Sequence, residues 1–189
     1  MKREKGIVMG FRIGITGVVM MSCLFTGNVL SGAEKKVLHD FTRNAFLTTY
    51  LDWKGKVAGN GDGLEIRATG KGGGLVNAAY DLRSVADGTL ALRLKVLPGN
   101  KESLLRIMLR DRDGTARFWS LPLKGCPEGK VMMVHVAGAL PLSQGEQEKG
   151  GKVPGLDLGH IQQFHIQGSF RGRQPLAVAL YELAVLPNS

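Results

Sequence analysis

Length, composition and charge limit this chain to one basic domain that no disulfide can cross-link. Its 189 residues carry 25 Lys and Arg against 16 Asp and Glu, a formal net charge of +9, and they include two cysteines. Cys126 is alone beyond an N-terminal leader that holds Cys23, so an intramolecular disulfide and a cysteine-based zinc site are excluded in the remainder. No run of consecutive basic residues concentrates the charge, which argues against nucleic acid as a partner.

Residues 1–33 have the pattern of an export signal. A basic leader precedes an uncharged apolar stretch over 13–25, and Ser31 and Ala33 supply the small side chains that a signal peptidase reads. We therefore expect a signal peptide over 1–33, one domain over 34–189, and a secreted or periplasmic protein. The leader holds four basic residues and one acidic residue, so 21 basic and 15 acidic residues remain, a net charge of +6.

An alternative interpretation of the leader is a lipid anchor. Met20-Met21-Ser22-Cys23 resembles a lipobox, in which Cys23 would be acylated and the domain tethered to a membrane. Thr26, Gly27 and Asn28 interrupt the apolar stretch before it reaches the ~20 residues that a span needs. No membrane span is expected after cleavage.

Beyond the leader, short segments with alternating apolar and polar residues predict about nine β-strands. No segment shows a sustained helical period with caps. Many short strands predict an all-β protein, an antiparallel β-sandwich. Residues 142–158, rich in Gly, Gln, Glu and Lys, are expected to form a long exposed loop. The predicted strands are 37–41, 63–69, 74–80, 89–96, 103–110, 115–121, 131–136, 161–168 and 176–186.

Strict alternation also predicts the core and one turn. Asp111-Arg-Asp-Gly114 is expected to be a hairpin turn with Gly114 in the left-handed region, because the later ligands of a calcium loop are missing. The apolar members of the alternating strands are expected to be buried; they include Leu92, Leu94, Leu105, Ile107, Leu109, Phe164 and Ile166.

The order of several short motifs resembles the galactose-binding-like jelly roll, a fold of carbohydrate-binding modules in exported bacterial proteins. The resemblance implies a jelly-roll sandwich and a carbohydrate-binding function in the cell envelope. It spans nearly all of 37–186, although each motif is weak alone. The motifs are His39-Asp-Phe41 followed by Trp53, Tyr80-Asp-Leu-Arg83, Leu109 to Thr115, Leu156-Asp-Leu158 with Ile161 to Ile166, and Leu180 to Val185.

The resemblance also implies a calcium site. Sugar-binding members often carry an Asp on the closing strand that helps to hold a structural calcium ion, and Glu182 takes that place here. Asp40, near the end of the first strand, would be its partner where the first and last strands meet. Carboxylate oxygens are ligands that calcium prefers.

Two kinds of side chain are candidates for ligand binding. Trp53, beside Tyr50, and Trp119, beside Phe118, could stack on sugar rings, although large aromatic residues more often fill a core. Trp119 and Arg117 are two residues apart on a predicted strand and therefore point to the same face, which favours the polar face for Trp119. Arg93, Arg106, Arg110 and His165 alternate with core positions and would form one basic face if their strands are neighbours. The alternative interpretation is a solvated sheet face without a ligand.

No catalytic motif is present. The sequence contains no nucleophile elbow, no H-E-x-x-H and no P-loop, and its four histidines lack metal-ligand spacing. The prediction is therefore an exported, non-catalytic β-sandwich that binds a carbohydrate, with acidic polysaccharide as the favoured ligand. The alternative is a structural or protein-interaction domain of the cell envelope without a small ligand.

Overall fold

The computed structural model describes residues 34–136, 140 and 155–187. The expected export signal, including Cys23, and most of the predicted loop 142–158 lie outside the described residues. Within the described ranges no helix is long and apolar enough to span a membrane.

Eleven strands and one short 3₁₀ helix, η1 (Arg83–Val85), are found in the described part of the chain. The strands are β1 (Lys36–Asp40), β2 (Thr48–Leu51), β3 (Val57–Gly59), β4 (Leu64–Thr69), β5 (Gly72–Tyr80), β6 (Thr89–Val96), β7 (Leu104–Asp111), β8 (Ala116–Pro122), β9 (Val131–His135), β10 (Ile161–Gln167) and β11 (Pro175–Leu186).

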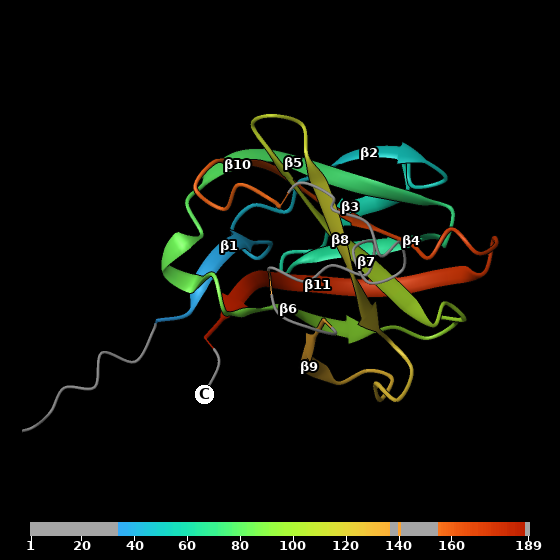
Figure 1. Cartoon of the computed structure of the whole chain (residues 1–189). Helices are drawn as coiled ribbons and strands as arrows, with labels where there is room; N and C mark the ends of the chain where they lie inside the picture. The colour runs from blue at the N-terminus through green and yellow to red at the C-terminus, as the bar shows by residue number, and fades with distance from the viewer. Residues whose placement is uncertain (1–33, 137–139, 141–154, 188–189) are drawn as a thin grey trace, which may run out of the picture. The chain divides into compact units, whose positions relative to one another are not determined.

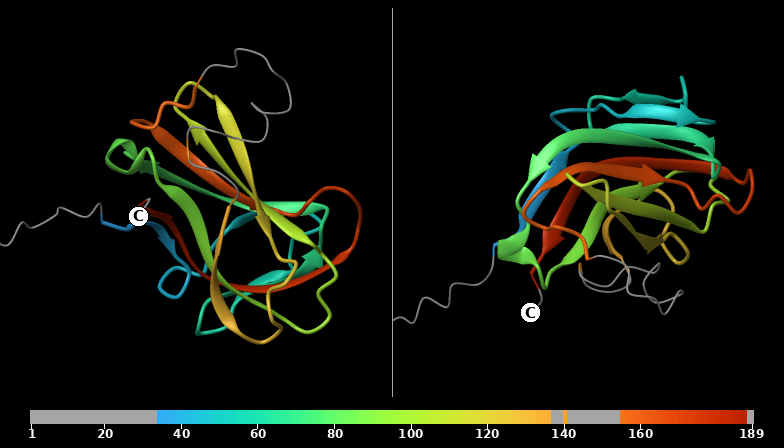
Figure 2. Two further views of the ribbon diagram at one scale, coloured as in Figure 1. Left: turned by 60° about the horizontal axis from the view of Figure 1, so that its bottom comes forward. Right: turned by 45° about the horizontal axis from the view of Figure 1, so that its top comes forward.

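The strands form two antiparallel sheets, which Figures 1 and 2 show as separate layers. Sheet A has the order β3-β4-β11-β6-β9, and β1 also pairs with β11. Sheet B has the order β2-β5-β10-β7-β8. Neighbours that are far apart in sequence, such as β10 between β5 and β7, are typical of a jelly roll. The predicted all-β antiparallel β-sandwich is confirmed.

The core lies between the two sheets. Every residue predicted from alternation to be buried, from Leu92 to Ile166, has an exposed fraction of 0%. The central strand β11 shifts register between Leu180 and Glu182, a β-bulge that returns Leu183 to the core. The Asp111 hairpin is confirmed as well: Gly114 has a φ of +88°, and the buried Asp111 carboxylate accepts hydrogen bonds from the backbone of Asp113 and Thr115.

Two strands, β2 and β3, were not predicted, and β5 begins earlier than expected. Gly72, Gly73 and Gly74 belong to β5, although glycine usually interrupts strands. Side chains from the segment 47–53 occupy the space where their Cβ atoms would lie. A Cβ on Gly74 would be 2.8 Å from Cβ of Leu47, and one on Gly72 would be 3.1 Å from Cγ of Trp53. The three glycines let β2 and the turn after it pack closely on β5.

Candidate functional site

The outer surface of sheet B carries a continuous group of side chains, most of which are polar or aromatic. They alternate with core residues along the five strands, so they point away from the sandwich. We call this group the polar face. Its members are Tyr50 on β2, Leu75 and Asn77 on β5, Gln163, His165 and Gln167 on β10, Arg106, Met108 and Arg110 on β7, and Phe118 on β8.

Strand register arranges the polar face in rows across the sheet. On β10, Gln167 lies opposite Arg106 on one side and Gly73 on the other, and Gly73 lies opposite Tyr50. The next row holds His165 opposite Met108 and Leu75, and Phe118 opposite Met108. The third row places Gln163 between Arg110 and Asn77. Strands that are distant in the sequence, such as β5 and β10, thus converge on one surface.

His165 is at the centre of a hydrogen-bond network on this face. Burial, together with the positive charge of Arg110, lowers the pKa of His165 to about 4, so its imidazole is neutral at pH 7. Its Nε2 is hydrogen-bonded to Oε1 of Gln163, and Nε2 of Gln163 donates to Oδ1 of Asn77 at 2.6 Å. With the proton on Nε2, Nδ1 faces the Tyr50 hydroxyl at 3.5 Å, which itself donates to Oε1 of Gln167 at 3.0 Å. The network orients the exposed amides in advance of any ligand.

The two arginines of the polar face differ from most other arginines of the chain. Arg43, Arg67, Arg83, Arg112 and Arg173 each have a carboxylate within 4 Å. Among the described residues, Arg106 and Arg110 have none. The Arg106 guanidinium lies 5.1 Å from the centre of the Phe118 ring, and its Nε is buried without a hydrogen-bond partner in the structure. Within the described ranges, two cations are therefore held on this face without a carboxylate within 4 Å.

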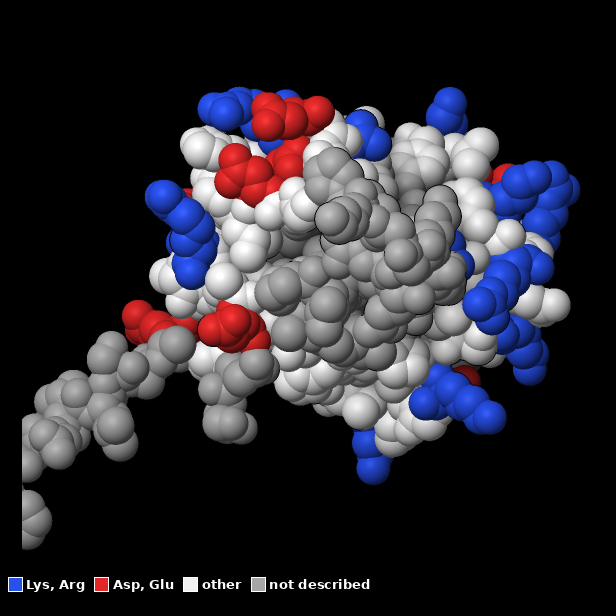
Figure 3. Space-filling view, in the orientation of Figure 1, with Lys and Arg blue, Asp and Glu red and all other residues white. Residues whose placement is uncertain are grey.

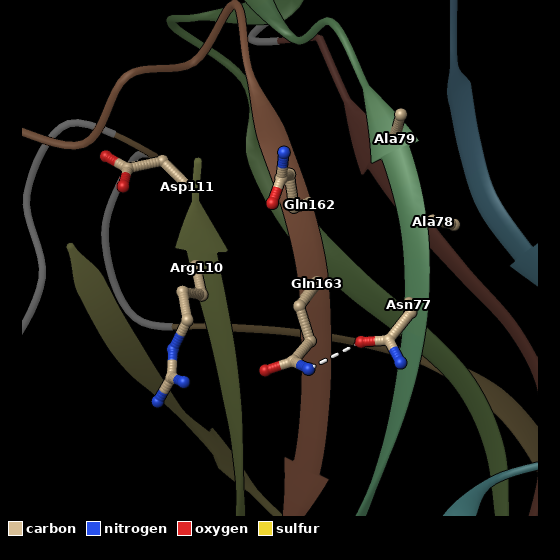
Figure 4. Close-up of a pocket in the computed structure, with 7 residues that line it drawn as sticks. All are labelled: Asn77, Ala78, Ala79, Arg110, Asp111, Gln162 and Gln163. Carbon is tan, nitrogen blue, oxygen red and sulfur yellow. Dashed lines mark hydrogen bonds between the residues drawn. The ribbon is translucent and has the colours of Figure 1, made fainter. Parts of the chain in front are cut away.

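A pocket of about 360 Å³ opens at the end of the polar face where β7 ends (Figure 4). Arg110 and Asp111 line one side, Asn77 and Ala79 the other, and Gln162 and Gln163 stand between them. A register shift between Ile161 and Gln163 is a β-bulge, so both consecutive glutamines line the pocket. The volume lies in the range of small-molecule sites. The lining offers a cation and three amides to one ligand, whereas the buried Asp111 carboxylate already accepts backbone hydrogen bonds through both oxygens.

A second hollow, of about 250 Å³, adjoins this pocket and shares Ala79 and Gln162 with it. Asp81 and His160 line its far side. His160 Nδ1 lies 2.7 Å from Oδ2 of Asp157, and the Asp157 amide donates to Oδ2 of Asp111. The buried Asp111 thus ties the segment before β10 to the hairpin after β7, and this tie fixes the shape of the hollow.

Both predicted tryptophan platforms are wrong. Trp53 and Trp119 each have an exposed fraction of 0%. Trp53 packs against Gly72 and donates from Nε1 to the Thr69 carbonyl at 2.9 Å, so it fills the edge of the core. Trp119 lies opposite Ile107, a core residue, and its parity is therefore inward. The residue that reaches the polar face from this strand is Phe118.

Arg93 does not belong to the predicted basic face. It lies on β6 in sheet A, whereas Arg106, Arg110 and His165 lie together on sheet B. The Arg93 guanidinium lies 5.5 Å from the centre of the Tyr181 ring on the outer side of sheet A. Alternation identified the outward residues correctly, but the two sheets separate them.

The implied calcium site does not fit the residues present. Asp40 and Glu182 are cross-strand partners, as the resemblance implies. However, both Glu182 oxygens accept from Lys35 Nζ at 2.9 and 3.0 Å, and Oδ1 of Asp40 accepts from the Thr42 hydroxyl at 2.6 Å. In the described ranges no group of three acidic, histidine or cysteine side chains could hold a metal ion. Calcium takes six to eight oxygen ligands, whereas both carboxylates here are already hydrogen-bonded to neighbouring side chains.

Similar structures confirm the jelly-roll fold. The chain superposes on part of the agarase AgWH50C with a TM-score of 0.57 at 14% identity, covering 82% of this chain and 25% of that one. An exo-beta-agarase gives a TM-score of 0.55 at 14% identity, with the same coverage. The family 11 carbohydrate-binding module of a Clostridium thermocellum cellulase gives 0.49 at 16% identity, covering 82% of this chain and 95% of that one. This chain spans about a quarter of the length of the agarases.

No family model matches the sequence, and no curated protein matches it. At these identities the structural likeness shows the fold alone. Function must therefore be inferred from the polar face itself.

Several site residues were not predicted as binding residues. Gln162 and Asn77 are the clearest, because a β-bulge and a pairing between distant strands bring them to the pocket. Phe118 was named only as the neighbour of Trp119. The signal in the sequence was the Gln162-Gln163 pair at the start of an alternating strand, where one of two consecutive polar residues should otherwise face the core.

Proposed function

We propose that this chain is a non-catalytic carbohydrate-binding domain that holds a polysaccharide across the polar face of sheet B. The observation that carries the proposal is the pre-ordered group on that face: amides, two arginines without a carboxylate partner among the described residues, and flanking aromatic rings. Amides and a neutral imidazole can exchange hydrogen bonds with sugar hydroxyl groups. Tyr50 and Phe118, on the two outer strands, can offer apolar ring surface to a sugar.

We propose further that the polysaccharide is acidic. Among the described residues, the arginines with a carboxylate within 4 Å do not include Arg106 or Arg110. A guanidinium fork matches the geometry of a carboxylate or a sulfate group. The two arginines are four residues apart on β7, which separates their Cα atoms by roughly 13 Å. One chain with repeated anionic groups could therefore contact both.

The leader pattern supports a location outside the cytoplasm, where such polysaccharides occur. The proposed domain would work there after removal of residues 1–33, or tethered through Cys23.

The test is calorimetric titration with polygalacturonate, a sulfated galactan and a neutral β-1,3-1,4-glucan, at low and high salt. Binding to the acidic glycans should be modest and should weaken with salt, because exposed ion pairs are weak and screened. The double variant Arg106→Gln, Arg110→Gln should lower affinity about tenfold or more. The matched control Arg93→Gln, Lys95→Gln removes the same charge from sheet A and should bind normally.

The outcomes separate the two parts of the proposal. Stronger binding to the neutral glucan, unaffected by salt, would refute the acidic ligand but keep the polar face as the site. Equal losses in the double variant and its control would place the site elsewhere. Absence of binding to every glycan would favour the structural or interaction domain.

A further inference from the structure

Three turns gather positive charge at one end of the sandwich. They are residues 51–56, which begin with the last residue of β2, 70–71 between β4 and β5, and 168–174 between β10 and β11. We call them the basic end. Asp52 is their one acidic residue. Their basic side chains, all on exposed residues, are Lys54, Lys56, Lys71, Arg171 and Arg173. Figure 3 shows Lys and Arg crowded along the corresponding right edge of the molecule.

Two large apolar side chains project from the same turns. Leu51 is 52% exposed and Phe170 is 41% exposed. Both have a positive φ, 54° and 58°, and within the described residues they are the two non-glycine positions that do. A bulky residue in this region is strained. The backbone therefore maintains an unfavourable conformation at both Leu51 and Phe170, each of which exposes an apolar side chain to solvent.

Backbone hydrogen bonds join the two projections into one unit. The Asp52 amide, next to Leu51, donates to the Lys71 carbonyl at 3.2 Å, and the Phe170 amide donates to the Gly70 carbonyl at 3.0 Å. Arg173 Nε also lies 3.8 Å from the Asp52 carboxylate. Leu51 and Phe170 thus flank the short β4–β5 turn and lie among the five cations.

The opposite end of the sandwich has the opposite charge. In the described parts of its turns, over 60–63, 81–88, 112–115 and 155–160, five aspartates outnumber two arginines. Acidic side chains are seen mainly on the left of Figure 3. Both ends of the described chain also lie on that side (Figure 1). The charge separation gives the domain one preferred orientation toward an anionic surface.

We propose that the basic end docks on an anionic lipid surface, with Leu51 and Phe170 entering the interface and the surrounding Lys and Arg lying against the phosphate groups. Apolar side chains within a basic surround are what peripheral binding to anionic membranes requires. A soluble polyanion would use the cations but would gain nothing from two strained, exposed apolar side chains. The proposal does not depend on glycan binding at the polar face.

The test is co-sedimentation of residues 34–189, which contain every strand of both sheets, with vesicles of phosphatidylcholine alone or mixed with phosphatidylglycerol. Leu51→Asn with Phe170→Asn should lower binding to the anionic vesicles about fivefold. Asparagine tolerates a positive φ, so this variant should keep or raise its melting temperature. Lys54→Gln, Arg171→Gln, Arg173→Gln should lower binding about tenfold or more.

A control triple variant outside the basic end, with Arg43→Gln on the β1–β2 connection and Arg83→Gln and Arg112→Gln in the acidic turns, removes the same charge and should bind vesicles normally. Equal binding to neutral and anionic vesicles would overturn the proposal, as would equal losses in the two triple variants. A third outcome would also overturn it. If substitution of the cations lowers vesicle binding, substitution of Leu51 and Phe170 does not, and polygalacturonate displaces the protein from vesicles, then the basic end is a polyanion site and not a lipid-docking surface.

Discussion

Tyr50 lies directly over Gly73 on the polar face. A Cβ at residue 73 would be 2.7 Å from Cζ of Tyr50 and 2.8 Å from Cβ of Gln167. The missing side chain therefore allows the phenol to reach the Gln167 amide and His165. One glycine in a strand interior fixes the position of an aromatic ring at the candidate site.

Substitution Gly73→Ala should displace Tyr50 and weaken any ligand bound to the polar face. We expect a loss of stability of about 1–3 kcal/mol, because overpacking forces neighbouring side chains to move. Chemical denaturation measures the loss, and glycan titration measures the effect on binding. Gly172→Ala is the control, since a Cβ at Gly172 meets nothing within 4 Å. Equal stability of the two variants would show that Tyr50 does not rest on Gly73.

The two tryptophans give a direct optical test of the core. They are the only tryptophans in the chain, and both side chains are fully buried. Iodide should therefore quench the intrinsic fluorescence poorly, and a glycan that saturates the polar face should leave the emission unshifted. Trp119→Ala should cost about 3–5 kcal/mol of stability. Strong iodide quenching in the native protein would show that at least one tryptophan is exposed to solvent.

The fold was largely predictable because alternation along a strand depends only on local sequence. It identified Leu105, Ile107 and Leu109 as core, and Arg106 and Arg110 as outward. Alternation does not show which strands are neighbours, so it could not separate Arg93 on sheet A from Arg106 on sheet B. That separation follows from long-range pairing of β6 with β9 and β11.

The errors at the site have the same origin. Trp119 and Arg117 are two residues apart and point to the same side of β8, so the charge of Arg117 favours an outward position for Trp119. However, Trp119 pairs with the core residue Ile107, which places this side of β8 inward, and Arg117 lies near the start of the strand. Gly72 and Gly73 lie outside the strand predicted over 74–80, because the reason for glycine at the start of β5 is a set of side chains from residues 47–53. Neither fact is contained in the local pattern.

The predicted processing of the leader can be tested by mass spectrometry of the protein recovered outside the cytoplasm of cells that express it. The small residues Ser31 and Ala33 predict a mature N-terminus at Glu34. Ala33→Arg should block this cleavage, since a signal peptidase needs a small residue there. An N-terminus at an acylated Cys23 would instead establish the lipid anchor, and Cys23→Ser should then abolish the acyl mass.

The stability of the domain should fall between pH 6.5 and pH 4 because of His165. Its folded pKa of about 4 lies below its ordinary value of 6.5. Between these values the unfolded chain binds a proton at residue 165 that the folded protein does not bind, so stability is lost as the pH falls. We expect a loss on the order of 1–2 kcal/mol, smaller than the full shift implies because water partly screens the site.

Carboxylates should add to the loss of stability at pH values below the histidine range. Hydrogen bonds from Thr42, Arg83 and His160 hold the pKa values of Asp40, Asp81 and Asp157, respectively, below their ordinary value of 3.8. A carboxylate with a lowered folded pKa stabilises the fold fully above its ordinary pKa, and this contribution is lost as the pH falls through the folded pKa. The histidine window is therefore separate from the acidic one.

Urea denaturation at several pH values should resolve the histidine contribution. His165→Gln has no group that titrates at this position, so its free energy of unfolding should change less than that of the native protein from pH 6.5 to pH 4. His135→Gln removes an exposed histidine of sheet A and should retain the native slope. If His165→Gln and the native protein lose stability in parallel, His165 is not a buried neutral group, and the network that orients Gln163 and Tyr50 is not organised as described.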